Sequence, residues 1–240
     1  MKRIVALTIS VIIALTAITG CAFKKQLTAF GLYTKAVNTI REAGGMEAEC
    51  KAVLDLSLIK VGIDMNIKQN GSDSEVTVIM SGEQVSKTIT VGDMVYTDAA
   101  GVKTRSPKAA PADDSIGDIS ALPKLAEDLF TDIEIVEDEN GGKALTIVIG
   151  SDTIAALLGE GAEIIDGIDF DDCEMTMYFD ADDNIKSMHL ESDAAMDFSE
   201  FEMKISLTVD YDFINLGTAP EISIPEDADD YTLINLTDNT

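Results

Sequence analysis

Apolar and polar residues alternate at every second position through most of the chain, and this pattern predicts β-strands. From Met46 to Leu58 the even-numbered positions are apolar, and from Ile59 onward the odd-numbered positions take over. Such a change of phase predicts a bulge or a tight reversal between two strands. The longest alternation runs from Phe201 to Phe213. A strand of that length suits a strongly curved sheet or partial barrel, in which the strands are tilted.

Shorter alternations and turn signals predict the remaining strands. Asn70-Gly71 is a strong hairpin signal, because both residue types tolerate the backbone of a tight turn. Loops are expected at 106–118 and 159–169, with an interruption at 192–199 before the longest strand. The other expected strands occupy residues 75–80, 85–91, 94–97, 102–105, 132–137, 143–149, 173–179 and 185–191.

One amphipathic helix is expected near the N-terminus, over residues 26–43. Gly44-Gly45 ends it, and its single apolar stripe has to be buried against the sheet. Short helical segments are also expected at 119–130 and 153–158. The predicted fold class is α+β: a strongly curved antiparallel sheet, or half-barrel, with the N-terminal helix and the short helices on its concave face. The stripe consists of residues at three- and four-residue spacing: Leu27, Phe30, Tyr33, Val37 and Ile40.

The first 20 residues have the features of an export signal. Lys2 and Arg3 precede an apolar run from Ile4 to Ile18, which is shorter than the roughly 20 residues that span a bilayer. The run continues through Thr19 and Gly20 to Cys21 and resembles a bacterial lipoprotein signal. In such signals the cysteine is acylated and becomes the first residue of the mature protein. The alternatives are a plain signal peptide, which the residues before Cys21 fit poorly, and a buried N-terminal helix.

These features divide the chain into four expected parts. They are a signal peptide at 1–20, a tether with the lipidated Cys21 at 21–25, a half-barrel domain at 26–230 and a polar tail at 231–240. The protein is then expected outside the cytoplasm, anchored to the bacterial cell membrane through Cys21.

The net charge excludes some partners. The formal charge is −27, and removing residues 1–20 takes away two positive charges and no acid, which makes it −29. Such a chain would repel the phosphates of nucleic acid and an anionic lipid surface. Its apolar content of 46% is too high for a disordered acidic tail. We expect a folded domain with a solvated acidic exterior, and binding of divalent cations or a cationic partner is the alternative.

Cys50 and Cys173 remain once Cys21 is assigned to the anchor. Both lie on the apolar phase of their strands, so both are expected inside the domain. In an exported protein they could form a disulfide or stay as two free buried thiols, and the sequence leaves both alternatives open.

The layout resembles the lipoprotein-carrier superfamily, which includes LolA-like carriers and lipid-binding lipoproteins of actinobacteria. The shared features are the lipoprotein signal, one amphipathic helix, and a meander of long antiparallel strands with short helices between its halves. The break at Gly44-Gly45, the hairpin at 94–98 and the closing segment 224–226 fit this layout over residues 26–230. The resemblance implies a half-open barrel whose apolar concave face binds acyl chains under a partial lid of helices. It implies no catalytic residues.

A set of flexible or aromatic side chains falls on the predicted inner face. Methionine adapts to variable apolar partners, so this face could line a lipid groove, and the alternative is a packed core under the helix. The candidate lining residues are Met46, Met65, Met175, Met177, Phe179, Phe201, Met203 and Phe213.

Other chemistry is weakly indicated. Asp180, Asp182, Asn184 and Glu191 have calcium-loop spacing, but Ile185 stands where such a loop needs glycine, so a hairpin turn is the better interpretation. His189 is expected on the outer face without a nucleophile beside it. We therefore expect no enzyme, metal site or cofactor. The predicted function is a lipoprotein that binds or transfers a lipid or other amphiphile, and the alternative is a non-catalytic envelope interaction or structural module with a filled barrel.

Overall fold

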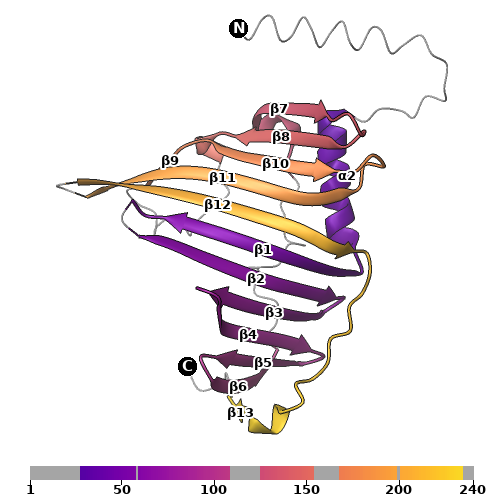
Figure 1. The fold of residues 1–240 in the computed structure, drawn as a ribbon, viewed down its shortest axis with the longest axis vertical. Coiled ribbons are helices and arrows are strands. Elements are labelled where there is room, and N and C mark those ends of the chain that lie inside the picture. Colours follow the sequence, from indigo (N-terminus) through magenta and orange to yellow (C-terminus); the bar gives the residue numbers. More distant parts are fainter. Residues whose placement is uncertain (1–27, 58, 109–124, 154–167, 199–200, 235–240) are drawn as a thin grey trace, which may run out of the picture.

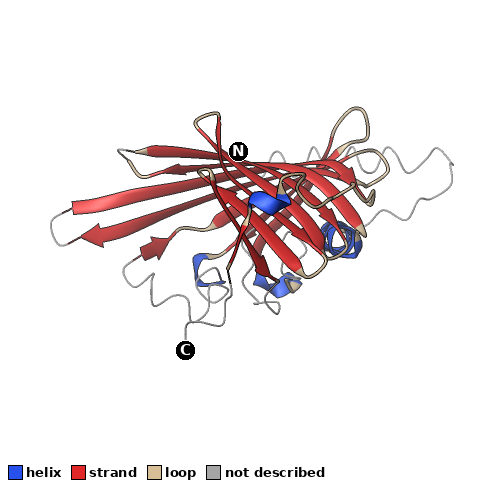
Figure 2. Ribbon diagram, turned by 90° about the horizontal axis from the view of Figure 1, so that it is seen from below, coloured by secondary structure: helices blue, strands red, loops and turns tan. Residues whose placement is uncertain are grey.

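A single curved sheet makes up most of the protein (Figure 1). The computed structural model describes residues 28–57, 59–108, 125–153, 168–198 and 201–234. The sheet has 13 strands in the order β13-β6-β5-β4-β3-β2-β1-β12-β11-β10-β8-β7, and β9 pairs with β11 off this path. It is curved and does not close, because β7 and β13 lie at opposite edges (Figure 2). Among the described residues, every strand pairing is antiparallel except that of β13 with β6, which is parallel.

The strands have the following bounds: β1 Gly45–Asp55, β2 Lys60–Asn70, β3 Asp73–Met80, β4 Glu83–Val91, β5 Met94–Ala99, β6 Val102–Pro107, β7 Phe130–Glu137, β8 Lys143–Ile149, β9 Ile168–Phe170, β10 Cys173–Phe179, β11 Ile185–Phe198, β12 Phe201–Leu216 and β13 Thr232–Leu233. The described helices are α2 (Ala29–Glu42) and two single 3-10 turns, η3 (Glu127–Leu129) and η5 (Ala228–Asp230).

The alternating pattern predicts most of these strands correctly. The change of phase after Leu58 is a tight reversal between β1 and β2, in which the Leu56 N–H donates to the Ile59 carbonyl at 2.8 Å. Gly71 adopts a positive φ of 57° in the β2–β3 turn, as the Asn-Gly signal predicts. Of the loop expected at 106–118, residues 106 and 107 belong instead to β6, and residues 109–118 lie outside the described residues, as do Cys21 and its flanking residues.

Two expectations about secondary structure are wrong. The interruption at 192–199 is absent as far as residue 198, since β11 runs without a break from Ile185 to Phe198 beside β12. In this part of β11, Ser192 and Ala194 pair with the apolar residues Leu207 and Ile205 of β12. Because one is polar and the other small, the alternation of apolar and polar residues is not visible in the sequence. The helix expected at 119–130 is, from residue 125 onward, only the η3 turn. Phe130 starts β7 instead, because its ring packs edge-to-face on Tyr33 with centroids 5.1 Å apart. Of the helix expected at 153–158, residues 151–153 are helical and the rest lies outside the described residues.

Helix α2 lies across one face of the sheet, called here the inner face (Figure 1). The Thr28 hydroxyl caps its start by accepting the Gly31 N–H at 3.0 Å. One stripe of the helix is buried, as its spacing predicts, and packs on side chains from β1, β8, β10 and β12. Leu145, Ile147 and Met177 are fully buried in this main core. The buried stripe is Leu32, Tyr33, Ala36, Val37 and Ile40.

A second, smaller core lies on the opposite, outer face. It consists of Ile89 of β4, Tyr96 of β5 and Tyr231, and it is covered by the C-terminal strap, residues 217–233. After β12 the strap passes close to Gly45. A Cβ atom on Gly45 would lie only 2.2 Å from the Cα of Ala219 in the strap, so this position needs glycine. Tyr96 and Tyr231 meet edge-to-face with centroids 5.5 Å apart. The strap then adds β13 to the β6 edge.

No helix in the described part of the chain is long and apolar enough to cross a membrane.

Cys50 and Cys173 are both buried free thiols, which answers the alternative left open by the sequence. Two strands, β12 and β11, separate β1 from β10. Three strand spacings put the cysteines at least about 14 Å apart, whereas a disulfide needs Cα atoms within about 7 Å. In addition, the register aligns Cys50 with Met177 and not with Cys173. A disulfide is therefore incompatible with this sheet.

Alkylation checks the state of the thiols. The chain from residue 22 onward contains two cysteines. When it is unfolded in iodoacetamide without reductant, its mass is expected to rise by two carbamidomethyl groups. The same sample treated with reductant first should reach the same mass. A mass that increases only after reduction would contradict the sheet order.

His189 lies on the outer face in an ion-pair cluster. Its Nδ1 lies 2.6 Å from Asp210 Oδ1, and its Nε2 lies 3.1 Å from Glu191 Oε1. The hydrogen bond with Asp210, and secondarily that with Glu191, raises the pKa of His189 above its usual 6.5. The resulting stabilisation is present below about pH 6.5 and is lost as the pH rises through the folded-state pKa.

An NMR titration of His189 tests this cluster directly, because the chain has a single histidine. The midpoint of the native protein is expected above 6.5. In Asp210→Asn it should move down toward 6.5, because the carboxylate whose hydrogen bond contributes most to the raised pKa is gone. Asp212→Asn, on the same face of β12, is the control and should leave it nearly unchanged. A native midpoint at or below 6.5 would show that the cluster does not form.

Candidate functional site

Helix α2 is too small to cover the inner face. Its 14 residues make it about 21 Å long. The twelve strands of the main path, spaced about 4.8 Å apart, span about 53 Å along the sheet. The inner face therefore has a part that α2 covers and a part that it does not.

The covered part contains most of the residues expected to line a groove. Met46, Met175 and Met177 are at most 7% exposed, and Phe179 and Phe213 are buried with them against α2. Met65 is half-buried and packs at the edge of this cluster. These six residues are thus brought together, and in this structure the helix fills the space in front of the five buried ones.

The other two predicted residues lie elsewhere. Met203 is half-buried near the start of β12, paired with Met196 of β11 and apart from the main core. Phe201 begins β12, and its side chain lies outside what the structure describes.

The part of the inner face beyond α2 is also apolar. Leu54 of β1 pairs with Leu207 of β12 and with Val61 of β2, so the three side chains share one row. Among the described residues, this row and its neighbours are half-buried and do not belong to the core around α2. We call this set the open apolar strip: Ala52, Leu54, Val61, Ile63, Val78, Met80, Ile205 and Leu207.

Sequence reasoning missed the distinction between the covered core and the open apolar strip. Met and Phe residues were predicted to line a groove because their side chains are adaptable or large, but five of them pack under α2. The strip is made mostly of β-branched and leucine side chains, which look like ordinary strand residues. The signal that could have found it is length: β1 and β2 each have 11 residues, more than a short helix crossing them can cover.

A polar pair, buried Cys50 and half-buried Tyr211, lies at the boundary between the two parts. The Cys50 thiol and the Tyr211 hydroxyl hydrogen-bond to each other on the inner face. Burial raises the pKa of both groups, so both stay protonated and neutral near pH 7. A neutral thiol is a poor nucleophile, and the pair adds no charge to the apolar surface.

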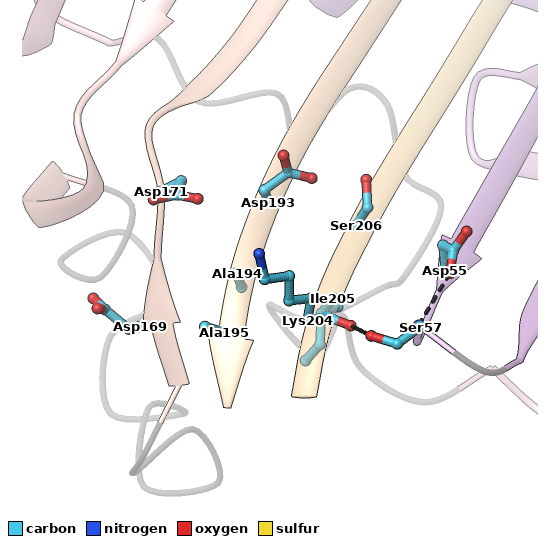
Figure 3. Close-up of a pocket in the computed structure, with 10 residues that line it drawn as sticks. All are labelled: Asp55, Ser57, Asp169, Asp171, Asp193, Ala194, Ala195, Lys204, Ile205 and Ser206. Carbon is cyan, nitrogen blue, oxygen red and sulfur yellow. Dashed lines mark hydrogen bonds between the residues drawn. The ribbon is translucent and has the colours of Figure 1, made fainter. Parts of the chain in front are cut away.

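A hollow on the described surface is lined mostly by polar side chains, and Ile205 of the open apolar strip reaches it. It has a volume of about 670 Å³ and lies where β9, β11, β12 and the end of β1 meet (Figure 3). Asp55, Asp169, Asp171 and Asp193 line it together with Lys204. By register, Asp55, Asp193 and Lys204 belong to the outer face. No group of acidic, histidine or cysteine side chains among the described residues has the geometry of a metal site.

A second hollow of about 590 Å³ lies beside the end of α2. Thr39 and Glu42 of α2 and Lys186 of β11 contribute polar groups to it, and Phe213 is the one predicted groove residue that reaches it. Apolar side chains also line it, among them Ile185, Ile214 and Leu216.

The residues with calcium-loop spacing form a hairpin turn, as expected. Asp180 Oδ1 accepts the backbone N–H groups of Asp182 and Asn184, each at 2.9 Å. The backbone hydrogen bond from Asn184, with smaller contributions from the Asn184 side chain and Lys186, lowers the pKa of Asp180 to about 2. The carboxylate is therefore engaged in holding the turn between β10 and β11.

The same turn fixes the position of α2. Asp183 forms an ion pair with Lys143 of β8, and its carbonyl accepts Lys35 Nζ of α2 at 2.8 Å. The helix is thus held at one end of the sheet, away from the open apolar strip.

No family of known sequences and no curated protein matches the chain. Several solved structures match the chain. The lipoprotein LppX of Mycobacterium tuberculosis matches with a TM-score of 0.45 and 9% identity, over 81% of this chain and 98% of its own. A LolA-superfamily protein of Nitrosomonas europaea matches with a TM-score of 0.29 and 7% identity, over 84% of this chain and 97% of its own. A chain of the Pseudomonas aeruginosa MucA/MucB complex matches with a TM-score of 0.26 and 9% identity, over 80% and 95%. The resemblance to LolA-like lipoprotein carriers is found among solved structures, and it is a resemblance of fold.

Proposed function

We propose that this protein is a membrane-anchored, extracytoplasmic lipoprotein that binds or transfers a lipid or other amphiphile. Its ligand lies on the inner face, which we take as the concave side of the sheet, with α2 closing one end. No step of this function requires a catalytic residue. The anchor is Cys21, and its acyl chains hold the domain close to the bilayer from which a lipid would enter.

The observation that carries the proposal is the open apolar strip. It continues the apolar surface of the main core beyond the reach of α2, and its side chains are only half-buried. Burying apolar area contributes about 25 cal/mol per Å², without regard to direction, so an acyl chain gains by lying on such a surface. The strip also lies on the face opposite the outer ion pairs of β11 and β12, such as the one between His189 and Asp210.

The predicted lining residues have two roles in this proposal. Met65 and Met203 border the open surface and would contact the ligand as the protein stands. Met46, Met175, Met177, Phe179 and Phe213 would contact it only if α2 shifts, and their flexible or flat side chains suit such repacking. Phe201 remains a candidate at the far end of β12.

One observation favours the alternative, a non-catalytic envelope interaction or structural module. The space under α2 is filled by side chains, with Leu145, Ile147 and Met177 showing no exposed surface. In that case the strip would be covered by protein and no lipid would be carried.

Native mass spectrometry separates the two functions. The chain from residue 22 onward, purified from cells that export it, is expected to carry a lipid. Leu54→Asn with Leu207→Asn should reduce the bound fraction about tenfold or more, because covering these half-buried leucines with an acyl chain would contribute up to about 1.5–3 kcal/mol each. Val53→Asn with Thr208→Asn is the matched control, since these residues pair next to the leucines on the outer face. A lipid-free protein that also ignores added fluorescent acyl probes would favour the structural module.

The anchor has its own test. Cells grown with an alkyne-labelled palmitate should incorporate the label into this protein, and Cys21→Ser should abolish the incorporation. Cys50→Ser is the control and should retain the label, because Cys50 is buried in β1. Labelling that persists in Cys21→Ser would show that acylation occurs elsewhere.

A further inference from the structure

The inner face changes chemistry from β3 to β4. On β1, β2 and β3 its residues are mostly apolar, but on β4, β5 and β6 hydroxyl groups replace them. Apolar residues of β4 and β5 point instead to the outer face, where Ile89 and Tyr96 form the second core with the C-terminal strap. The inner positions between Ser86 and Ser106 are Ser86, Thr88, Thr90, Val95, Thr97, Ala99, Val102, Thr104 and Ser106.

Threonines stand side by side across these strands. Val76 of β3 pairs with Thr88, Thr88 with Thr97, and Thr97 with Thr104. Thr232 of β13 extends the row at the sheet edge. With strands about 4.8 Å apart, the four threonines span about 14 Å. We call Thr88, Thr97, Thr104 and Thr232 the threonine row.

The row has unused hydrogen-bonding capacity. Within the described residues, no hydrogen bond is formed by the hydroxyls of Thr88, Thr97 or Thr104, which are half-buried. On the outer face, by contrast, Thr146 and Thr176 bond to each other at 3.1 Å. A threonine hydroxyl can both donate and accept, so a row of them offers paired sites to a ligand that does the same.

The row is also uncharged. None of the inner positions between Ser86 and Ser106 carries a charge, whereas the outer positions of the same strands include Lys87, Asp98, Lys103 and Arg105. A phosphate or carboxylate group would need cationic partners, which the inner positions between Ser86 and Ser106 lack, and would be repelled by a chain of net charge −27.

We propose that the threonine row receives the uncharged, hydroxyl-bearing head group of the amphiphile, such as a glycerol or sugar, while its acyl chains lie on the open apolar strip. This inference rests on the proposed function. The two surfaces are contiguous: Val78 of the strip pairs with Ser86 at the border of the hydroxyl region. A ligand with an apolar tail and a neutral polyhydroxyl head therefore matches the inner face along its width.

A lipid-binding comparison tests the inference. The chain from residue 22 onward retains every described residue. It is mixed with phosphatidylcholine vesicles that contain a fluorescent monogalactosyldiacylglycerol or a phosphatidylglycerol with the same labelled chains. The galactolipid is expected to bind more tightly. Thr88→Val with Thr97→Val should weaken galactolipid binding about tenfold, the effect of losing two hydrogen bonds, and leave phosphatidylglycerol binding unchanged.

Two control variants separate hydroxyl loss from misfolding. Thr77→Val removes a hydroxyl from the outer face of β3, opposite Lys87, and should leave both affinities unchanged. Thr88→Ser with Thr97→Ser keeps the hydroxyls and should retain the preference for the galactolipid. If the double valine variant does not fold, each single valine substitution must still reduce that preference.

The outcomes are distinguishable. Binding of both lipids without a head-group preference, or a preference that survives the valine substitutions, overturns the threonine row as a head-group site and leaves lipid binding intact. Failure of the unmodified chain to bind either lipid overturns the proposed function and this inference together.

Discussion

The mismatch in size between one helix and one sheet determines the rest of this structure. A 14-residue helix cannot bury a sheet whose main path has twelve strands, since about 21 Å of helix faces about 53 Å of sheet. Where α2 lies, Leu145, Ile147 and Met177 are fully buried and the core is dense. Beyond it the same face stays apolar on β1, β2 and β12 and then becomes hydroxyl-rich on β4 to β6. Across the sheet, the inner face therefore has three zones: the core under α2, the open apolar strip and the hydroxyl-rich region of β4 to β6.

Much of the inner face is not covered by any described residue, and other contacts hold the sheet together there. The pairing of β1 with β12, from Met46 opposite Leu216 to Asp55 opposite Ser206, joins the two halves of the chain into one ladder. At the far edge, the C-terminal strap packs Tyr231 on Tyr96 from the outer face, and Lys103 forms an ion pair with Asp227. These contacts stabilise β4 to β6 from outside, so that part of the sheet needs no helix on its inner face.

The proposed function follows from the different chemistry of the two faces of the sheet. The outer face has the ion pairs and the strap. The inner face offers non-directional burial in the strip and neutral hydrogen bonding in the threonine row. An anchor at Cys21, a few residues before α2, would hold this surface near its source of ligand.

The sequence by itself determined most of the strands and the main helix. Alternation with period two reports which residues share a face, so β8 and β10 were predicted to the residue, and the ends of β1, β2 and β12 to within three residues. It could not report β11 beyond Glu191, where Ser192 and Ala194 weaken the alternation. Only the tertiary structure decided which apolar residues are core and which are open surface. Met177 and Leu207 look alike in the pattern, but α2 reaches the first and not the second, because burial depends on contacts distant in sequence. The same holds for Cys50 and Cys173, which share a face yet lie three strands apart.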